Sequence, residues 1–175
     1  MGVELPGPTK AIISASQFIQ GWGGLITLMC IISGVMLFRF MIGASPAFKK
    51  GVDGASLKLP IFGPVIAQST ISRIALIKAN LFSDGVDVLE ILDIATSSTS
   101  NVLYVEALER VKRGVFSGED MSKLCAKEKM FPDTYSQLIA VGERTGNLEE
   151  MFTSISNYYE EEFDTVVGNI STMIE

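Results

Sequence analysis

Histidine is absent from all 175 residues of the chain. Its absence excludes histidine-based catalytic triads, most zinc sites and the usual proton shuttle at physiological pH. Basic residues are also fewer than acidic ones, with 14 lysines and arginines against 20 aspartates and glutamates, so the net charge is −6. Because proteins that bind nucleic acid usually carry a basic surface, this balance argues against RNA or DNA as a partner.

Cysteine is scarce, with only two in the chain. Cys30 lies in an apolar run and Cys125 in a charged amphipathic stretch. They are far apart in sequence and lack the spacing of metal ligands. We therefore expect two separate thiols, with no disulfide, no metal site and no cofactor.

One long apolar stretch stands out near the N-terminus of a chain whose mean hydropathy is +0.35. Residues 22–42 contain a single charge, Arg39. As a helix this stretch would extend for about 32 Å, the thickness of a bilayer core. It predicts a transmembrane helix. The alternative, a buried helix of a soluble protein, is less typical because such helices seldom run so far without charge.

The flanking charges predict an orientation for this span. Only one base, Lys10, precedes it, whereas four lie at its far end or soon after: Arg39, Lys49, Lys50 and Lys58. Since bases favour the cytoplasmic side, the C-terminal part should be cytoplasmic and residues 1–21 should form an outer, periplasmic loop with a short amphipathic helix. Residues 43–64, rich in Gly, Pro and Lys, are predicted to be a juxtamembrane linker.

Residues 65–175 show apolar positions at helical spacing and no strand-like alternation. Short polar or glycine-containing breaks divide them into six helices, as expected of an antiparallel bundle. The predicted fold class is therefore all-α, a transmembrane helix followed by a six-helix antiparallel bundle that forms a cytoplasmic domain.

Two of these breaks show clear stop and start signals. Gly85 and Gly146 are placed to end helices in the left-handed conformation. Each is followed by an N-cap and a glutamate three residues later, which predicts capping boxes, in the pairs Asp87 with Glu90 and Asn147 with Glu150. The stretch around Gly146, "GERTGN", lacks the Lys-Ser/Thr pair of a phosphate-binding loop, so we interpret it as a helix hairpin.

Two glutamates are harder to explain as ordinary surface residues. Glu143 lies beside apolar residues close to the hairpin turn, and Glu162 lies at the edge of the apolar seam of the last helix. One hypothesis is an ion pair inside the bundle with Arg110 or Arg113. The other is a surface that contacts a partner or a second subunit, which would also include Glu149.

Four stretches resemble one known family: "LKLPIFGPV", "LFSDGVDVLEILDIA", "QLIAVGERTGNLEEMF" and "YYEEEFD". They are similar to the second half of the type II secretion F family, the polytopic inner-membrane platform proteins of type II secretion systems and type IV pilus machines. Pro132 is expected to open the fifth helix of the bundle, with Gly142 on one of its faces, and the resemblance adds Pro60 and Gly63 to the residues expected to shape the fold. Val102 departs from the pattern, because similar sequences often have proline at this first helical position.

The resemblance runs from Glu4 to the last residue and covers an outer loop, the middle span and the second of two homologous cytoplasmic domains. It implies a piece of a longer protein that ends where another span would begin.

The resemblance also implies a function. It is that of a non-enzymatic platform in the bacterial inner membrane, which couples a cytoplasmic hexameric assembly ATPase to the extraction and polymerisation of pilin or pseudopilin subunits. Other inner-membrane platform proteins and further copies of the chain are the remaining expected partners. Two alternatives stay open: a membrane-tethered signalling adaptor, and a membrane enzyme that uses Glu143, Glu162 and Asp164 with a divalent cation.

Overall fold

A computed structural model describes residues 22–174 of the chain, with the side chains of residues 22–24, 38, 41, 42, 44, 171, 173 and 174 left out. The amphipathic helix predicted within residues 1–21 lies outside the described residues.

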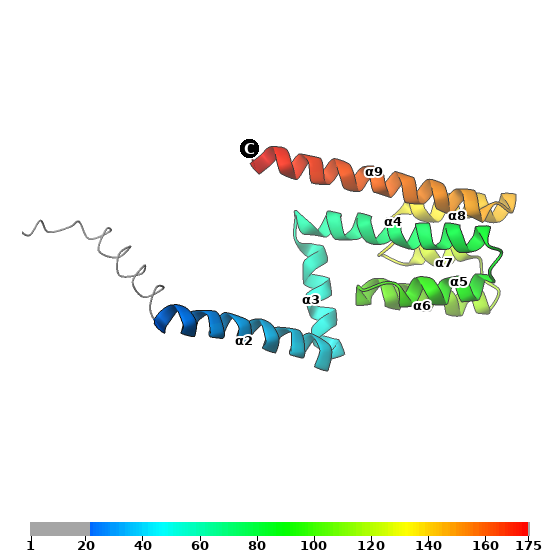
Figure 1. The fold of residues 1–175 in the computed structure, drawn as a ribbon. Helices are drawn as coiled ribbons and strands as arrows, with labels where there is room; N and C mark the ends of the chain where they lie inside the picture. The colour runs from blue at the N-terminus through cyan, green and yellow to red at the C-terminus, as the bar shows by residue number, and fades with distance from the viewer. Residues whose placement is uncertain (1–21, 175) are drawn as a thin grey trace, which may run out of the picture. The chain divides into compact units, whose positions relative to one another are not determined.

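The described residues form only helices, eight in number and joined by short turns (Figure 1). In chain order they are α2 (Trp22–Ala44), α3 (Pro46–Lys58), α4 (Phe62–Ser83), α5 (Val88–Ser97), α6 (Val102–Phe116), α7 (Met121–Lys127), α8 (Asp133–Thr145) and α9 (Leu148–Ile174). They divide into two compact units, Met1–Lys49 and Lys50–Glu175. The all-α prediction is confirmed.

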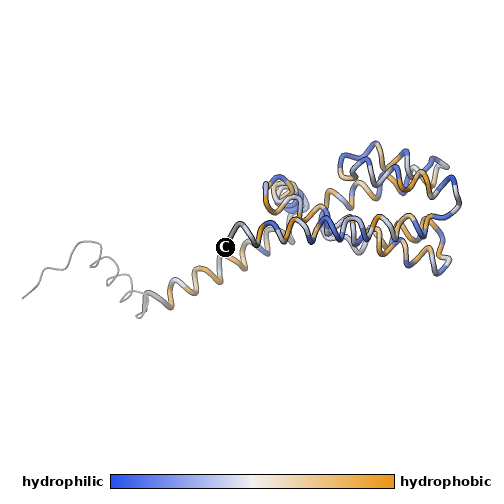
Figure 2. The backbone as a smooth tube through the Cα atoms, turned by 90° about the horizontal axis from the view of Figure 1, so that it is seen from above, coloured by the Kyte–Doolittle hydropathy of each residue, from blue (hydrophilic) through white to orange (hydrophobic). Residues whose placement is uncertain are grey.

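Helix α2 accounts for nearly all of the described part of the first unit, and it coincides with the predicted span (Figure 2). The described large apolar side chains of α2, from Leu25 to Phe40, are between 55 and 73 % exposed. Within the described residues no single helix meets the length and composition of a membrane span, the apolar segment of α2 being Leu25–Leu37. The predicted helix is therefore confirmed. Its crossing of a membrane stays a prediction.

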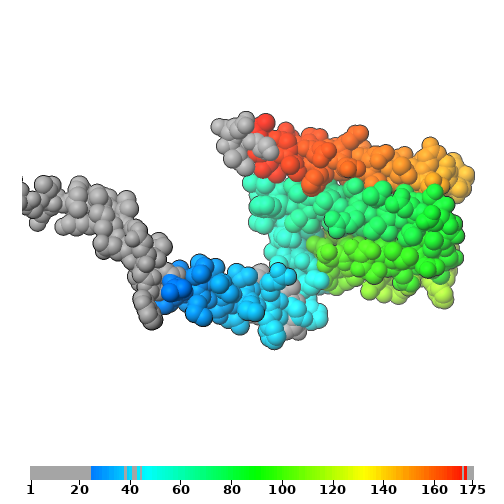
Figure 3. Space-filling model, in the orientation of Figure 1, coloured from blue at the N-terminus to red at the C-terminus, as the bar shows by residue number. Residues whose placement is uncertain are grey.

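The second unit contains the predicted six-helix bundle, α4 to α9. Each of these helices packs against the next, and the long α9 also packs against α4 along its length, as the space-filling view shows (Figure 3). Aromatic rings fill much of the core: Phe131 stacks on Tyr135 with ring centres 4.6 Å apart, and Phe82 stacks on Phe152 at 5.5 Å. Burial of these rings and of the surrounding aliphatic side chains is the main favourable contribution to the folding of this unit.

The segment predicted as a linker, residues 43–64, contains the helix α3. Pro46 begins this helix, where a missing backbone N–H leaves no hydrogen bond unmade. Two glycines in the interior lower its intrinsic helix propensity, and their presence is what favoured a linker in the sequence.

Contacts with distant residues stabilise α3 against that low propensity. The carboxylate of Asp53 accepts a hydrogen bond from the backbone N–H of Val102 at 2.9 Å, at the first turn of α6. Lys50 forms an ion pair with Glu106 at 2.7 Å, and Leu57 packs against the core. A proline at position 102 would lack this N–H, so Val102 supplies the donor that joins α6 to α3.

Candidate functional site

The α8–α9 hairpin has the predicted glycine turn. Gly146 lies in the left-handed region with φ 72°, and the N–H of Asn147 donates to the carbonyl of Gly142 at 3.0 Å. The side-chain oxygen of Asn147 accepts from the N–H of Glu150 at 3.3 Å. The Glu150 carboxylate, expected to accept from the backbone N–H of Asn147, accepts instead from its side-chain amide, because Gly142 already accepts from that N–H.

The α4–α5 turn follows the same plan at Gly85, where φ is 73°. The Asp87 carboxylate accepts from the N–H of Leu89 at 2.9 Å and so caps α5. Glu90 lies exposed in the first turn of α5, where its charge suits the helix dipole. Within the described part of the chain, no hydrogen bond joins its side chain to Asp87, so half of the predicted capping box is present.

Four further predicted residues shape turns and packing. Pro132 directly precedes α8. Gly142 is buried, and a Cβ at this position would lie 3.0 Å from side-chain atoms of Leu148 and Met151. Pro60 lies exposed in the turn between α3 and α4, next to the buried Gly63. These residues therefore belong to the architecture of the bundle.

Glu143 is engaged inside the bundle. Its carboxylate accepts from the backbone N–H of Met121 at 2.6 Å and from the hydroxyl of Ser122 at 2.5 Å, both in the first turn of α7. Asp120, the residue before α7, makes no capping hydrogen bond and pairs with Lys123 at 2.5 Å. Glu143 therefore caps α7 from the neighbouring helix α8.

The arginines expected to pair with Glu143 or Glu162 have other surroundings. Arg110 forms a two-point contact with Glu128, at 2.6 and 2.7 Å, and lies 3.9 Å from Glu106. These hydrogen bonds and charges raise the pKa of Arg110 above its usual value. Arg113 is exposed near the end of α6. In the described part of the chain, the structure therefore shows no buried ion pair between either of these arginines and Glu143 or Glu162.

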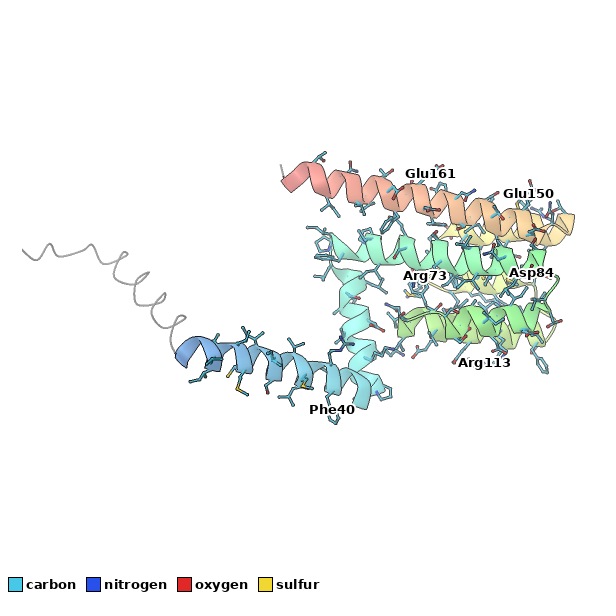
Figure 4. All side chains as sticks on the ribbon, in the orientation of Figure 1. Phe40, Arg73, Asp84, Arg113, Glu150 and Glu161 are labelled. Atoms are coloured by element: carbon cyan, nitrogen blue, oxygen red, sulfur yellow. The ribbon has the colours of Figure 1, made fainter. Side chains whose placement is uncertain are left out.

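Glu149 and Glu162 are both exposed on α9, which carries six acidic residues and no base. Without these six, the chain has 14 acids and 14 bases, so the whole net charge of −6 corresponds to α9. We call them the α9 acidic surface; two of its members, Glu150 and Glu161, are labelled in Figure 4. All six side chains are exposed: Glu149, Glu150, Glu160, Glu161, Glu162 and Asp164.

The structure gives no support to a carboxylate-bound metal. In the part of the chain that it describes, no three acidic or cysteine side chains lie close enough together to hold a metal ion. Glu143 is occupied by α7, whereas Glu162 lies near Gln68, whose amide donates to it at 3.5 Å. The three carboxylates of the enzyme hypothesis are therefore not brought together as a cation site.

One residue that the sequence reasoning missed is Lys78, which is fully buried on α4. Its ammonium donates to the hydroxyl of Tyr135 at 3.3 Å and lies 5.1 Å from the centre of the Phe152 ring. Burial lowers the pKa of Lys78 to about 8, and burial raises the pKa of the nearby Cys125 thiol to about 11. A signal was present in the sequence, because Lys78 lies four residues after Ile74 on the apolar stripe of α4.

These features describe an all-helical domain, with an exposed acidic helix and a core that contains a buried lysine. Residues 78–175, more than half of the chain, match the family model described as "Type II secretion system (T2SS), protein F". The chain therefore belongs to the type II secretion system protein F family, as the resemblance predicted.

Named relatives fall into two groups. The chain is 32 % identical to the type IV pilus assembly protein PilC of Pseudomonas aeruginosa, over 99 % of this chain and 46 % of that protein. It is 30 % identical to PilC of Thermus thermophilus, over 100 % of this chain and 43 % of that protein. It is 26 % identical to the type II secretion system protein F of Pseudomonas aeruginosa, over 99 % and 42 %. The chain thus spans less than half the length of these relatives.

Proposed function

We propose that this chain is part of an inner-membrane platform that assembles a type IV pilus or a type II secretion pseudopilus. In this role the bundle lies in the cytoplasm, contacts a hexameric assembly ATPase and transmits its action to pilin or pseudopilin subunits. Family membership and the names of the relatives support the assembly role. The exposed apolar side chains of α2 support a membrane location for the first unit.

The observation that carries the partner contact is the concentration of the net charge on α9. Six exposed carboxylates on one helix without a base repel each other, and a basic partner surface would relieve that repulsion. Complementary charge of this kind speeds association and selects the correct partner. Glu149 and Glu162 therefore remain candidate contact residues, whereas the carboxylate of Glu143 has a structural use inside the bundle.

A charge reversal tests the contact. In membranes that contain the full chain, Glu162→Lys should reduce the amount of assembly ATPase that co-purifies with it and should reduce filament assembly. Glu109→Lys, an equal change of charge at an exposed position on α6, is the matched control and should retain the ATPase. Both variants should keep the unfolding transition of the unmodified chain, because both side chains are exposed.

Two results would contradict this proposal. Equal retention of the ATPase by Glu162→Lys and Glu109→Lys would show that the α9 acidic surface is not the contact. Failure of the unmodified chain to retain either the ATPase or a pilin would contradict the platform role and favour the signalling adaptor.

A further inference from the structure

The turn between α3 and α4 presents an unusual group of exposed apolar side chains. Leu59, Ile61 and Phe62 are 49, 48 and 61 % exposed, and the two helices that meet there are bent by 107°. We call these three residues the apolar corner. Single exposed apolar residues are common, but three within four positions indicate a surface that meets something other than water.

The apolar corner lies at an end of the bundle where the first turns of α4 and the last turns of α9 carry no charged residue. No charged residue occurs in residues 59–72 or in residues 165–174. Ser72 donates to the carbonyl of Ser156 at 3.2 Å and Gln68 reaches Glu162 at 3.5 Å, so α4 and α9 run antiparallel. This register places the start of α4 beside the region of α9 that follows Asp164, toward the end marked C (Figure 1).

The packing around Gly63 fixes the shape of the corner. A Cβ at Gly63 would lie 2.2 Å from the carbonyl oxygen of Leu57, so only glycine permits this close approach of α3 to α4. The N–H of Gly63 also donates to the carbonyl of Leu59 at 2.8 Å. The exposed apolar side chains are therefore held on a defined bend by the backbone on either side.

We propose that the apolar corner, with the uncharged ends of α4 and α9, dips into the lipid interface of the membrane that carries the platform. This inference rests on the proposed membrane location of the chain. Helices α3 and α4 together reach the apolar composition of a membrane span, but their bend rules out a straight crossing. A bent apolar tip of this kind suits the boundary between headgroups and acyl chains, where amphipathic segments bind.

The charges nearest to the corner fit a lipid surface. Lys58, exposed at the end of α3, directly precedes the corner, and its long side chain can extend to lipid phosphates while the neighbouring apolar groups enter the membrane. The acids of α9 end at Asp164, so its last turns, residues 165–174, are uncharged. A protein partner would usually meet a rim of polar and charged residues, whereas residues 59–67 carry no polar side chain at all.

Lipid contact is tested by a fluorescent probe on the full chain reconstituted in vesicles of phosphatidylethanolamine and phosphatidylglycerol. Ile61→Cys, in a chain that also carries Cys30→Ser, is labelled with an environment-sensitive dye. Cys125 can stay, because it is buried and burial raises the pKa of its thiol to about 11. Phe116→Cys is the matched control, since Phe116 is 77 % exposed at the end of α6, which is the end of the bundle opposite to the corner.

We expect lipids with a spin label near the headgroup to quench the dye at position 61 severalfold more than the dye at position 116. Equal quenching at both positions would overturn the proposal. A dye at position 61 that is shielded from water only at high protein density, without quenching by labelled lipid, would show that a second copy covers the corner, which also overturns it. Leu59→Cys repeats the measurement if Ile61→Cys disturbs folding, as judged by circular dichroism.

The two proposals fail in different ways. Strong quenching at position 61 in a chain that does not retain the assembly ATPase would contradict the platform role and leave the lipid contact standing. Retention of the ATPase without quenching at position 61 would contradict only the lipid contact.

Discussion

Replacing the buried lysine of α4 with methionine, Lys78→Met, should make the bundle more stable at neutral pH. Lys78 has no exposed surface, and its ammonium is hydrogen-bonded to Tyr135 at 3.3 Å. Across the described residues, no carboxylate forms an ion pair with it. Methionine has a similar length and no charge, so it can fill the same space without the penalty for removing an ion from water.

The magnitude follows from the pKa of Lys78. Lowering this pKa from 10.5 to about 8 corresponds to roughly 3 kcal/mol of unfavourable burial at pH 7. Two contributions are lost in the variant: the hydrogen bond to Tyr135, about 1 kcal/mol, and the attraction to the Phe152 ring, about 1 kcal/mol. The variant should therefore gain about 1 kcal/mol in the free energy of unfolding.

The pH dependence gives a second, independent signature. Between pH 8 and 10.5 the unfolded chain holds a proton on Lys78 that the folded chain has released, so this residue makes the free energy of unfolding rise with pH. The raised pKa of Cys125, about 11, acts in the opposite direction above its usual value of 9.0. The difference between the unmodified chain and Lys78→Met largely removes the effect of Cys125. The advantage of Lys78→Met in the free energy of unfolding should fall by roughly 1 kcal/mol between pH 7 and 9, so that the two chains become about equally stable.

Urea titration in detergent, followed by the near-ultraviolet circular dichroism of tyrosine, measures both quantities. All four tyrosines lie in the bundle, at positions 104, 135, 158 and 159. Lys129→Met removes an equal charge from an exposed position and serves as the control. A loss of stability in Lys78→Met, with no change of the difference between pH 7 and 9, would refute the reasoning and show that the aromatic rings stabilise the charge by more than burial opposes it.

Two further substitutions test the bundle itself. Glu143→Gln should lower the free energy of unfolding by about 1–2 kcal/mol, because it weakens charge-assisted hydrogen bonds to the start of α7. Exposed Glu149→Gln should leave the urea midpoint unchanged, and equal midpoints for the two variants would contradict the capping role. Gly63→Ala should lower stability by about 1–3 kcal/mol through the clash with α3. Gly51→Ala, a helical position with open space around it, should instead gain about 0.5–1 kcal/mol in the same titration, and a similar gain for Gly63→Ala would disprove the clash.

The helices and turns of the bundle could be predicted from the sequence because their signals are local. The left-handed Gly146 and the cap Asn147 act within a few residues of their own positions. Helix α3 could not be predicted in this way, because its stability depends on contacts such as that of Asp53 with Val102, 49 positions away. The glycines within α3 indicate only a low intrinsic helix propensity. The contacts with distant residues outweigh it.

The site residues show the same division. The sequence places Glu143 beside apolar residues, but the partners of its carboxylate in α7 lie 21 and 22 positions earlier in the chain and depend on how α7 and α8 pack. Lys78 lies on the apolar stripe of α4, yet a lysine at such a position often extends its ammonium to solvent. Only the closing of Tyr135 and Phe152 over α4 shows that this lysine stays inside.

The two proposed contacts use different parts of the same helix pair and can operate together. The acids of α9 end at Asp164, and the uncharged end of the bundle begins one residue later. A lipid-bound apolar corner would therefore leave the α9 acidic surface in the cytoplasm, at a short and fixed distance from the membrane. Two effects would oppose deeper insertion. These acids are repelled by anionic lipid, and charged groups lose hydration when they enter the bilayer. A basic partner that docks on α9 would then be held close to the membrane surface, as the proposed platform role requires.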